Sequence, residues 1–479
     1  MIIRQQGGMT VTRSLALLGA IILILGVSSC SNTVKEEAST TGSDLGELKL
    51  SLNVKKYTLS NGLRVLIVEN HRLPIYSYYT FYDVGGRFEG PGTTGATHFL
   101  EHMMFKGAKK YGPGKFDTLI ESNGGSTNAY TTFDSTVYYQ SMPAHTIDTI
   151  IDLEADRMEN LLLEKVAFDK ERDVVLEERK YRYENSSKGK LYLSMMQEMF
   201  KGTPYGLSVI GSVEDLITLN RDQMFDFFKK FYTPDNAIIV VVGDVDSSDV
   251  ISQIKKKFGD LDRSSKEIQD LKKEKDKDEL YVANPSYGSH KKVYGNTKTP
   301  TFMMSYRGEP LGTRKAYVMD ILSSILGVGS SSYFHQKYVK NKSPILNSVS
   351  VSNYNLQKNG VFFISGELGR NVNLEKVRRT LVKETRSLCD KAIDDRGVQK
   401  TKNQFLVMYY GEIQNNAGVA SFIGSTEKYY GDYKHYQKEL EIYDSITTDE
   451  VKKTCKEVFA GNKQVFVSVW DKHKKAKGK

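Results

Sequence analysis

Cysteine is scarce in this sequence, with 3 residues in 479, and there is a single tryptophan. So few cysteines exclude a disulfide-framework domain, and Cys389 and Cys455 either pair with each other or remain free thiols. Long apolar runs are also lacking. The stretch from Leu15 to Val27 has about 13 residues, fewer than the roughly 20 that span a bilayer as a helix. The glycines of a dinucleotide-binding fold are missing, and no nucleic-acid module is recognisable, since a net charge of +9 alone does not establish one.

The first 30 residues have the pattern of an export signal. Arg4 and Arg13 precede the apolar run, which has the length of a signal-peptide core. The run ends in Val27-Ser28-Ser29-Cys30, which resembles a bacterial lipobox. We therefore expect cleavage of residues 1–29, lipidation of Cys30, and an exported lipoprotein of a bacterial cell envelope, in the outer membrane or on the periplasmic face. The alternative is an uncleaved anchor with an incidental cysteine. Residues 30–49 are predicted to be a flexible tether.

The stretch His98-Phe99-Leu100-Glu101-His102 carries the main chemical signal. Two imidazoles four residues apart on a helix lie one turn apart on one face, so both can reach a single metal ion. Glu101 lies close enough to that face to accept a proton from a water molecule at the metal. The order H-x-x-E-H is the inverse of the commoner zinc motif H-E-x-x-H. The competing interpretation is a pair of histidines at the edge of a core.

A zinc enzyme of this kind needs a third protein ligand and one open position. The acidic stretch from Phe168 to Arg179 is predicted to be helical and supplies candidates. Glu171 and Glu178 are seven residues apart, which is two helical turns, and therefore share a face. Glu177 is rotated by about 100° from Glu178 and is expected to lie on a solvated face.

These residues together resemble the insulinase/pitrilysin family of inverted-motif zinc peptidases, in its half-length branch with the mitochondrial processing peptidase. In that family a ligand glutamate follows the motif by about 75 residues, and Glu178 follows His102 by 76. The resemblance implies that His98, His102 and Glu178 hold one Zn²⁺ per chain. It also implies that Glu101 is the base and Glu171 an auxiliary acid behind the site.

The same resemblance assigns substrate binding to Asn128-Ala129-Tyr130, as an edge strand that pairs with an extended peptide. The alternative is an ordinary strand of the core sheet. Expected substrates are unfolded or short peptides, because a closed clamshell excludes folded proteins.

The order of strand and helix patterns predicts an α+β fold. A hairpin is expected around Asn61-Gly62, followed by a strand at 75–84. Further predicted ranges are helices at 143–163, 167–186, 187–200, 221–231, 314–327, 331–342 and 373–412, and strands at 237–242, 301–306, 345–351, 361–365 and 465–469. The resemblance implies two homologous domains, each an antiparallel-rich sheet packed against helices, forming half of a clamshell. We predict a catalytic zinc-binding domain at 50–262, a charged linker at 263–290, and a second domain without the metal motif at 291–479.

The second half departs from the family pattern. Active relatives of a single chain type carry Arg, six residues and then Tyr there, to bind the substrate carbonyl. Here Val339 stands at the Arg position, and Leu346 or Asn347 at the Tyr position. The resemblance therefore implies a zinc endopeptidase that needs a second family member, as a heterodimer or alternatively a homodimer. The competing function is a catalytically idle, membrane-tethered scaffold or peptide-binding subunit.

Overall fold

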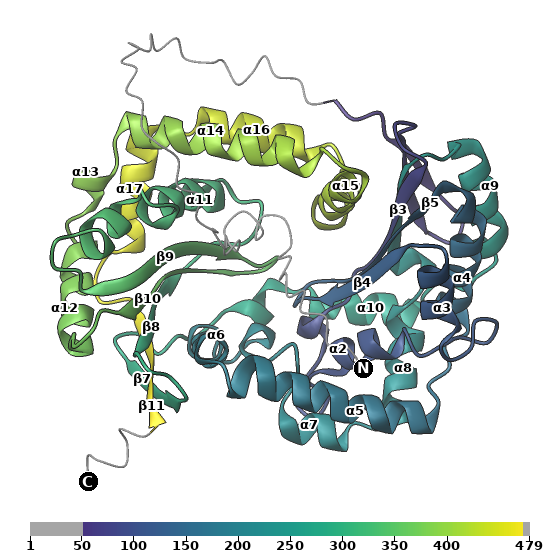
Figure 1. Ribbon diagram of the computed structural model, residues 1–479, viewed down its shortest axis with the longest axis horizontal. Coiled ribbons are helices and arrows are strands. Elements are labelled where there is room, and N and C mark those ends of the chain that lie inside the picture. The colour runs from purple at the N-terminus through teal and green to yellow at the C-terminus, as the bar shows by residue number, and fades with distance from the viewer. Residues whose placement is uncertain (1–50, 473–479) are drawn as a thin grey trace.

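The computed structural model describes residues 51–472, so the predicted signal peptide, tether and lipidated Cys30 lie outside the described residues. Its strands form two sheets (Figure 1). The first has the order β1-β2-β6-β3-β5-β4, with bounds Lys55–Thr58, Arg64–Glu69, Ala237–Gly243, Ile75–Tyr82, Thr136–Pro143 and Ser126–Thr131. The second has the order β7-β11-β8-β10-β9, with bounds His290–Gly295, Val465–Asp471, Thr301–Arg307, Gly360–Leu368 and Leu346–Asn355.

Helices cover both sheets, which confirms the predicted α+β class. Those before the second sheet are α2 Ala96–Met103, α3 Lys115–Ser122, α4 Ile147–Glu159, α5 Lys165–Arg179, α6 Ser187–Met199, α7 Val213–Thr218, α8 Arg221–Phe231, α9 Ser247–Phe258 and α10 Lys266–Lys275. Those after β8 are α11 Arg314–Gly327, α12 Leu374–Thr385, α13 Cys389–Ala392, α14 Asp395–Glu412, α15 Asn416–Tyr430, α16 His435–Ser445 and α17 Thr448–Val458. Within residues 51–472, no helix is both long and apolar enough to span a membrane.

Strand β6 shows why the first sheet is buried on both faces. Successive side chains of a strand point to opposite faces, and all seven residues of β6 are buried. Ile239 and Val241 join the core formed with the helices of the first half. Ile238 and Val240 join a second core that also contains residues of the second half. Each half of the chain therefore completes the packing of the other.

The halves cover each other's sheets through two helices. Helix α15 belongs to the second half but packs on β3 and β6 of the first sheet, as Figure 1 shows. Conversely, Met195 and Met199 of α6 pack with Val465 and Val467 on the second sheet. Gly424 lets α15 approach closely, because a Cβ atom there would lie 2.2 Å from the ring of Phe81. This exchange holds the two sheets in one body.

Two predicted segments have a different structure. The helix expected at 331–342 is shorter and irregular. Two α-helical residues, 333 and 334, lead into a π-helical turn, His335–Val339, so the helical segment covers 333–339 of the predicted range. The predicted linker 263–290 contains α10, and Ile268 within it is buried.

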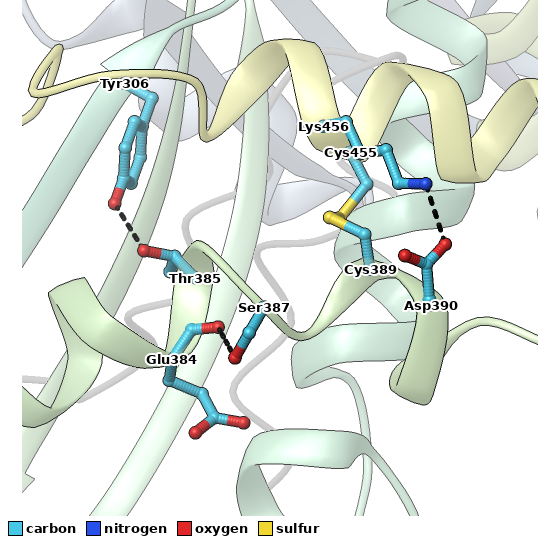
Figure 2. The surroundings of a disulfide bond; sticks show 8 residues. All are labelled: Tyr306, Glu384, Thr385, Ser387, Cys389, Asp390, Cys455 and Lys456. Atoms are coloured by element: carbon cyan, nitrogen blue, oxygen red, sulfur yellow. Dashed lines mark hydrogen bonds and ion pairs between the residues drawn. A yellow bond between two sulfur atoms is a disulfide. The ribbon is translucent and has the colours of Figure 1, made fainter.

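The two remaining cysteines form a disulfide, one of the two states that the sequence allows. It joins α13 to α17 through Cys389 and Cys455, whose Cα atoms lie 5.8 Å apart (Figure 2). Asp390 and Lys456 form an ion pair of 2.8 Å beside it. The covalent link therefore closes a loop of 66 residues around the helices of the second half.

Candidate metal centre

Helix α2 presents the motif because its two faces have different neighbours. Phe99, Leu100 and Met103 are fully buried in the core of the first half. The helix begins after Gly95, whose φ is 88°. A Cβ atom at Gly95 would lie 2.7 Å from the main-chain oxygen of Ile210, so glycine permits this close approach. The opposite face of α2 carries the motif side chains toward α5.

A buried carboxyl group caps the start of α2. Glu89 accepts hydrogen bonds from the backbone N–H groups of Gly95, at 2.8 Å, and Thr97, at 2.6 Å. Both donors lie in the first turn, where a helix has N–H groups without intrahelical partners and a partial positive charge. Glu89 therefore orients the helix that carries His98 and His102.

His98, His102 and Glu178 converge as the sequence predicts. Oε2 of Glu178 lies 3.2 Å from Nε2 of His102 and 3.7 Å from Nε2 of His98, and the three ligand atoms lie within 4.8 Å of one another. A tetrahedral zinc ion with ligands at about 2.0–2.2 Å holds them about 3.3–3.6 Å apart, and the two distances to Glu178 are close to that spacing, so the group is compatible with zinc. Among the described residues, no other group of three such side chains converges in this way.

Glu171 lies behind this group rather than in it. Its Oε1 atom is 2.9 Å from Nδ1 of His102, and its Oε2 atom is 2.7 Å from Nζ of Lys106. Donation from Nδ1 to Glu171 orients the ring so that Nε2 of His102 faces Glu178, where loss of its proton would free a lone pair for a metal ion. In contrast to Glu171, the side chain of Glu177 is 74% exposed, so Glu177 lies on a solvated face as predicted.

Electrostatics separate the two histidines. Burial lowers the pKa of His98 to about 3, and the neighbouring His102 adds to this effect, so the His98 imidazole is neutral. Burial also opposes charge on His102, but its hydrogen bonds with Glu171 and Glu178 outweigh burial and raise its pKa to about 9. Burial likewise opposes charge on Glu178, yet His102, His98 and Arg182 lower its pKa to about 2. Glu178 is therefore anionic, as a carboxylate that holds a metal ion must be.

Glu101 has the properties of a base that works near neutral pH. Its side chain is buried, and burial raises its pKa to about 7, although a hydrogen bond from Thr131 acts in the opposite direction. The hydroxyl of Thr131 donates to Oε2 of Glu101. A proton acceptor is most effective when its pKa lies near the working pH.

Thr131 also connects this base to the predicted peptide-binding strand. It is the last residue of β4, which contains Asn128, Ala129 and Tyr130. In the described part of the chain β4 pairs with β5 alone and forms one edge of the first sheet. Its position at an edge next to Glu101 is what the predicted role in substrate binding requires.

Sequence reasoning missed four residues that support the centre, either directly or through helix α2. These are Glu89 and Thr131, described above, Lys106 next to Glu171, and Arg182, whose Nη2 atom lies 2.8 Å from Oε1 of Glu178. Arg182 had a recognisable signal, because it follows Glu178 by four residues on a continuing helical turn. Contacts across the fold, such as Thr131 with Glu101, have no local sequence signal.

The expected clamp positions carry no charged donor. Val339 packs against the core of the second half, and Leu346 is fully buried at the start of β9. Asn347 is exposed on the same strand. The second half also lacks an H-x-x-E-H sequence.

Two sheet-and-helix halves and one inverted zinc motif define an inverted-motif peptidase fold. Residues 64–213 match the family model described as "Insulinase (Peptidase family M16)", and residues 218–405 match "Peptidase M16 inactive domain". The chain belongs to the insulinase family, peptidase family M16, which confirms the resemblance seen in the sequence.

Curated relatives and solved structures agree with this assignment. The chain is 30% identical over 372 residues to the zinc protease PqqE of Helicobacter pylori, covering 76% of this chain and 81% of that protein. It is 28% identical over 286 residues to the mitochondrial-processing peptidase subunit beta of Dictyostelium discoideum, covering 59% of each. A protease from Helicobacter pylori of known crystal structure superposes with a TM-score of 0.78 at 25% identity, covering 87% of this chain and 99% of that one.

Proposed function

We propose that this chain is a zinc-dependent endopeptidase that hydrolyses unfolded or short peptides. The observation that carries the proposal is the convergence of His98, His102 and Glu178 beside a buried Glu101 whose pKa is about 7. The names of the relatives as zinc proteases support it.

In the proposed reaction, Glu101 and Glu171 have different roles beside the metal ion. When bound, zinc supplies Lewis-acid chemistry, which acidifies water and polarises a peptide carbonyl. The Glu101 carboxylate accepts a proton from the attacking water and returns it to the leaving amine. Glu171 holds the tautomer of His102 through Nδ1 and so orients its Nε2 atom.

Substrate binding is assigned to β4. An extended peptide that adds to this edge would form main-chain hydrogen bonds with Asn128, Ala129 and Tyr130, and such bonds require little of the peptide's sequence. Because β4 ends at Thr131, which donates to Glu101, the bound peptide would run toward the metal centre.

A second chain is proposed to complete the site. The side chains of Val339 and Leu346 provide no hydrogen-bond donor for the tetrahedral oxyanion, and Asn347 provides only a neutral amide. A preorganised donor typically contributes about 3–4 kcal/mol. We propose a zinc-less family member that supplies the Arg and Tyr in a heterodimer, and the similarity to a protein named as a peptidase subunit supports this. Lipidation of Cys30 would tether the assembly to a membrane of a bacterial envelope.

Metal analysis and hydrolysis of a quenched peptide test these proposals on the purified chain, alone and mixed with a co-encoded family member. One zinc per chain with activity only in the mixture is the expected result. Full activity of the chain alone would contradict the proposed requirement for a partner and would support the proposed peptidase function. Absence of bound zinc would contradict the proposed peptidase function and would favour the alternative function of a catalytically idle scaffold.

A further inference from the structure

A basic groove lies on the second half of the molecule, away from the metal centre. Its main wall is α12, which in Figure 1 stands on the opposite side of the molecule from α2 and α5. Leu374, Val377 and Leu381 bury one face of α12 in the core. The remaining surface carries Arg378, Arg379 and Lys383, and Arg386 follows at the end of the helix. They line a cavity of about 290 Å³.

The second wall is the turn that leads into β11. It contributes the side chains of Asn462 and Gln464 to the same cavity. Gln464 is 5% exposed, and its Nε2 atom donates to Oδ1 of Asn462 at 2.7 Å. This hydrogen bond fixes the orientation of the Asn462 side-chain amide, whose Nδ2 N–H groups remain available as donors. The groove is therefore built from four cations and an oriented neutral donor.

The positive charge of this groove is poorly compensated. Among the described residues, the one ion pair made by its four cations joins Arg378 to Glu375, at 2.9 Å. Nε of Arg379 donates to the main-chain oxygen of Glu375, at 3.3 Å. Lys383 and Arg386 form no ion pair within residues 51–472. A concave surface lined with charge of one sign concentrates ions of the opposite sign.

A second cavity on the same half of the molecule has balanced charges, so the excess of positive charge is confined to the groove on α12. It is lined by three lysines, Lys452, Lys453 and Lys456, and by Asp390, Asp449 and Glu457. Lys456 is paired with Asp390 at 2.8 Å (Figure 2). Equal numbers of acids and bases make it a matched control for an electrostatic proposal.

We propose that the groove on α12 is a binding site for an anionic phosphate group. Guanidinium groups present planar pairs of N–H donors that match phosphate oxygens, and such charge-assisted bonds are stronger than neutral ones. Three arginines, one lysine and the Asn462 amide supply this donor set from two sides. The phosphate group belongs either to a soluble phosphate compound or to an anionic lipid headgroup. The proposal does not depend on the peptidase activity.

Calorimetric titration of the full chain with inorganic pyrophosphate tests the site. We expect saturable binding at one site per chain. The variant R379Q/R386Q, which changes two exposed side chains and leaves the Arg378–Glu375 pair intact, should lose affinity by about tenfold or more. The variant K452Q/K453Q removes the same charge from the control cavity and should bind as the parent does. Absence of saturable binding, or an equal loss in both variants, would overturn the proposal.

A competition experiment identifies the source of the phosphate. Short-chain phosphatidylglycerol and the matching phosphatidylcholine are added as monomers to the pyrophosphate complex. Displacement by phosphatidylglycerol alone supports the site as one for a lipid headgroup. If neither lipid displaces pyrophosphate, the result supports a soluble phosphate ligand. Equal displacement by both lipids would show that the groove does not select for net anionic charge and would contradict the proposal.

Discussion

His102 is held between two carboxylates that have different tasks. Glu178 faces Nε2, where a metal ion would bind, and Glu171 faces Nδ1, where it fixes the tautomer. Lys106 in turn holds Glu171. Burial opposes charge on Glu171, but the hydrogen bonds from His102 and Lys106 keep its pKa below the usual value. We therefore expect the metal affinity of the centre to depend on Glu171, which lies outside the proposed ligand set.

Replacing Glu171 by Gln tests this dependence. We expect the zinc affinity of Glu171→Gln to fall by about 10–100-fold, since neutral glutamine is a weaker acceptor for the His102 N–H group. Competition with a chelator of known affinity measures the change. Glu177→Gln is the matched control, because Glu177 is exposed on the same helix. An unchanged zinc affinity in Glu171→Gln would contradict the assigned role.

Glu101 can be tested separately from the metal ligands. Glu101→Gln keeps an oxygen that accepts from Thr131 but loses the basic carboxylate. We expect full zinc content with hydrolysis reduced by about 10²–10⁴-fold. Metal analysis and quenched-peptide turnover, in the mixture with the partner if the chain alone is inactive, measure both properties. Normal turnover would exclude Glu101 as the base.

At the scale of elements, α15 and α6 decide how the two sheets are covered. Each helix packs on the sheet of the other half. Gly424 permits the contact between α15 and Phe81, which is 1% exposed and has little freedom to move. Strand β4 and helix α2 form a second functional pair, because Thr131 of β4 contacts Glu101 of α2.

A pair of glycine substitutions measures the contact of α15. Gly424→Ala should lower the free energy of unfolding by about 1–3 kcal/mol, because its methyl group overlaps the Phe81 ring. Gly411→Ala on α14 has open space around its Cβ position, so alanine should be neutral or add up to about 1 kcal/mol through its helix propensity. Denaturant unfolding compares the two variants. Equal effects would contradict the close approach.

A buried aspartate joins three elements of the second half and predicts a pH effect. Asp320 of α11 accepts hydrogen bonds from Asn353 of β9, at 2.9 Å, and Tyr443 of α16, at 2.8 Å. Burial raises its pKa to about 7, against a usual value of 3.8. Between these pH values the folded state holds a proton that the unfolded state releases, so rising pH destabilises the fold.

The substitution Asp320→Asn should remove the part of the pH dependence of stability that Asp320 causes, because asparagine does not titrate. The parent is expected to lose stability relative to Asp320→Asn as the pH rises from about 4 to about 7, by on the order of 4 kcal/mol at most. Above pH 7 the difference should be constant. Unfolding curves of both proteins at several pH values measure it. A difference that is independent of pH would show that Asp320 is ionised in the folded state.

At the scale of the whole molecule, the disulfide and the shared core hold segments that are far apart in the chain. Cys389 and Cys455 are separated by 66 residues. Replacing both by Ala should lower the free energy of unfolding by about 2–4 kcal/mol, because the open loop gains entropy when the chain unfolds. A reductant should destabilise the parent by a similar amount and leave the double variant unchanged. No effect of the reductant on the parent would contradict the pairing.

Much of the metal centre was predictable from the sequence because it depends on spacing within single helices. Residues four apart on α2 and seven apart on α5 must share a face wherever those helices lie. The strand at 237–242 and the helix at 314–327 were equally local, since continuous apolar runs and N-capping residues set their limits. The candidate ligands His98 and His102 followed from these local patterns, whereas the choice of Glu178 as the third followed from the family resemblance.

Other features depend on segments that meet only when the chain is folded. The sequence predicted neither the exchange of α6 and α15 nor the cap that Glu89 places on α2. It left the pairing of Cys389 and Cys455 open, and it predicted a regular helix at 331–342, where the structure has a shorter segment that ends in a π-helical turn. The sequence by itself determined which side chains one helix presents together, because helix geometry is local. The tertiary structure alone decided which neighbours those side chains meet, because these contacts join residues up to several hundred positions apart and depend on how both halves pack.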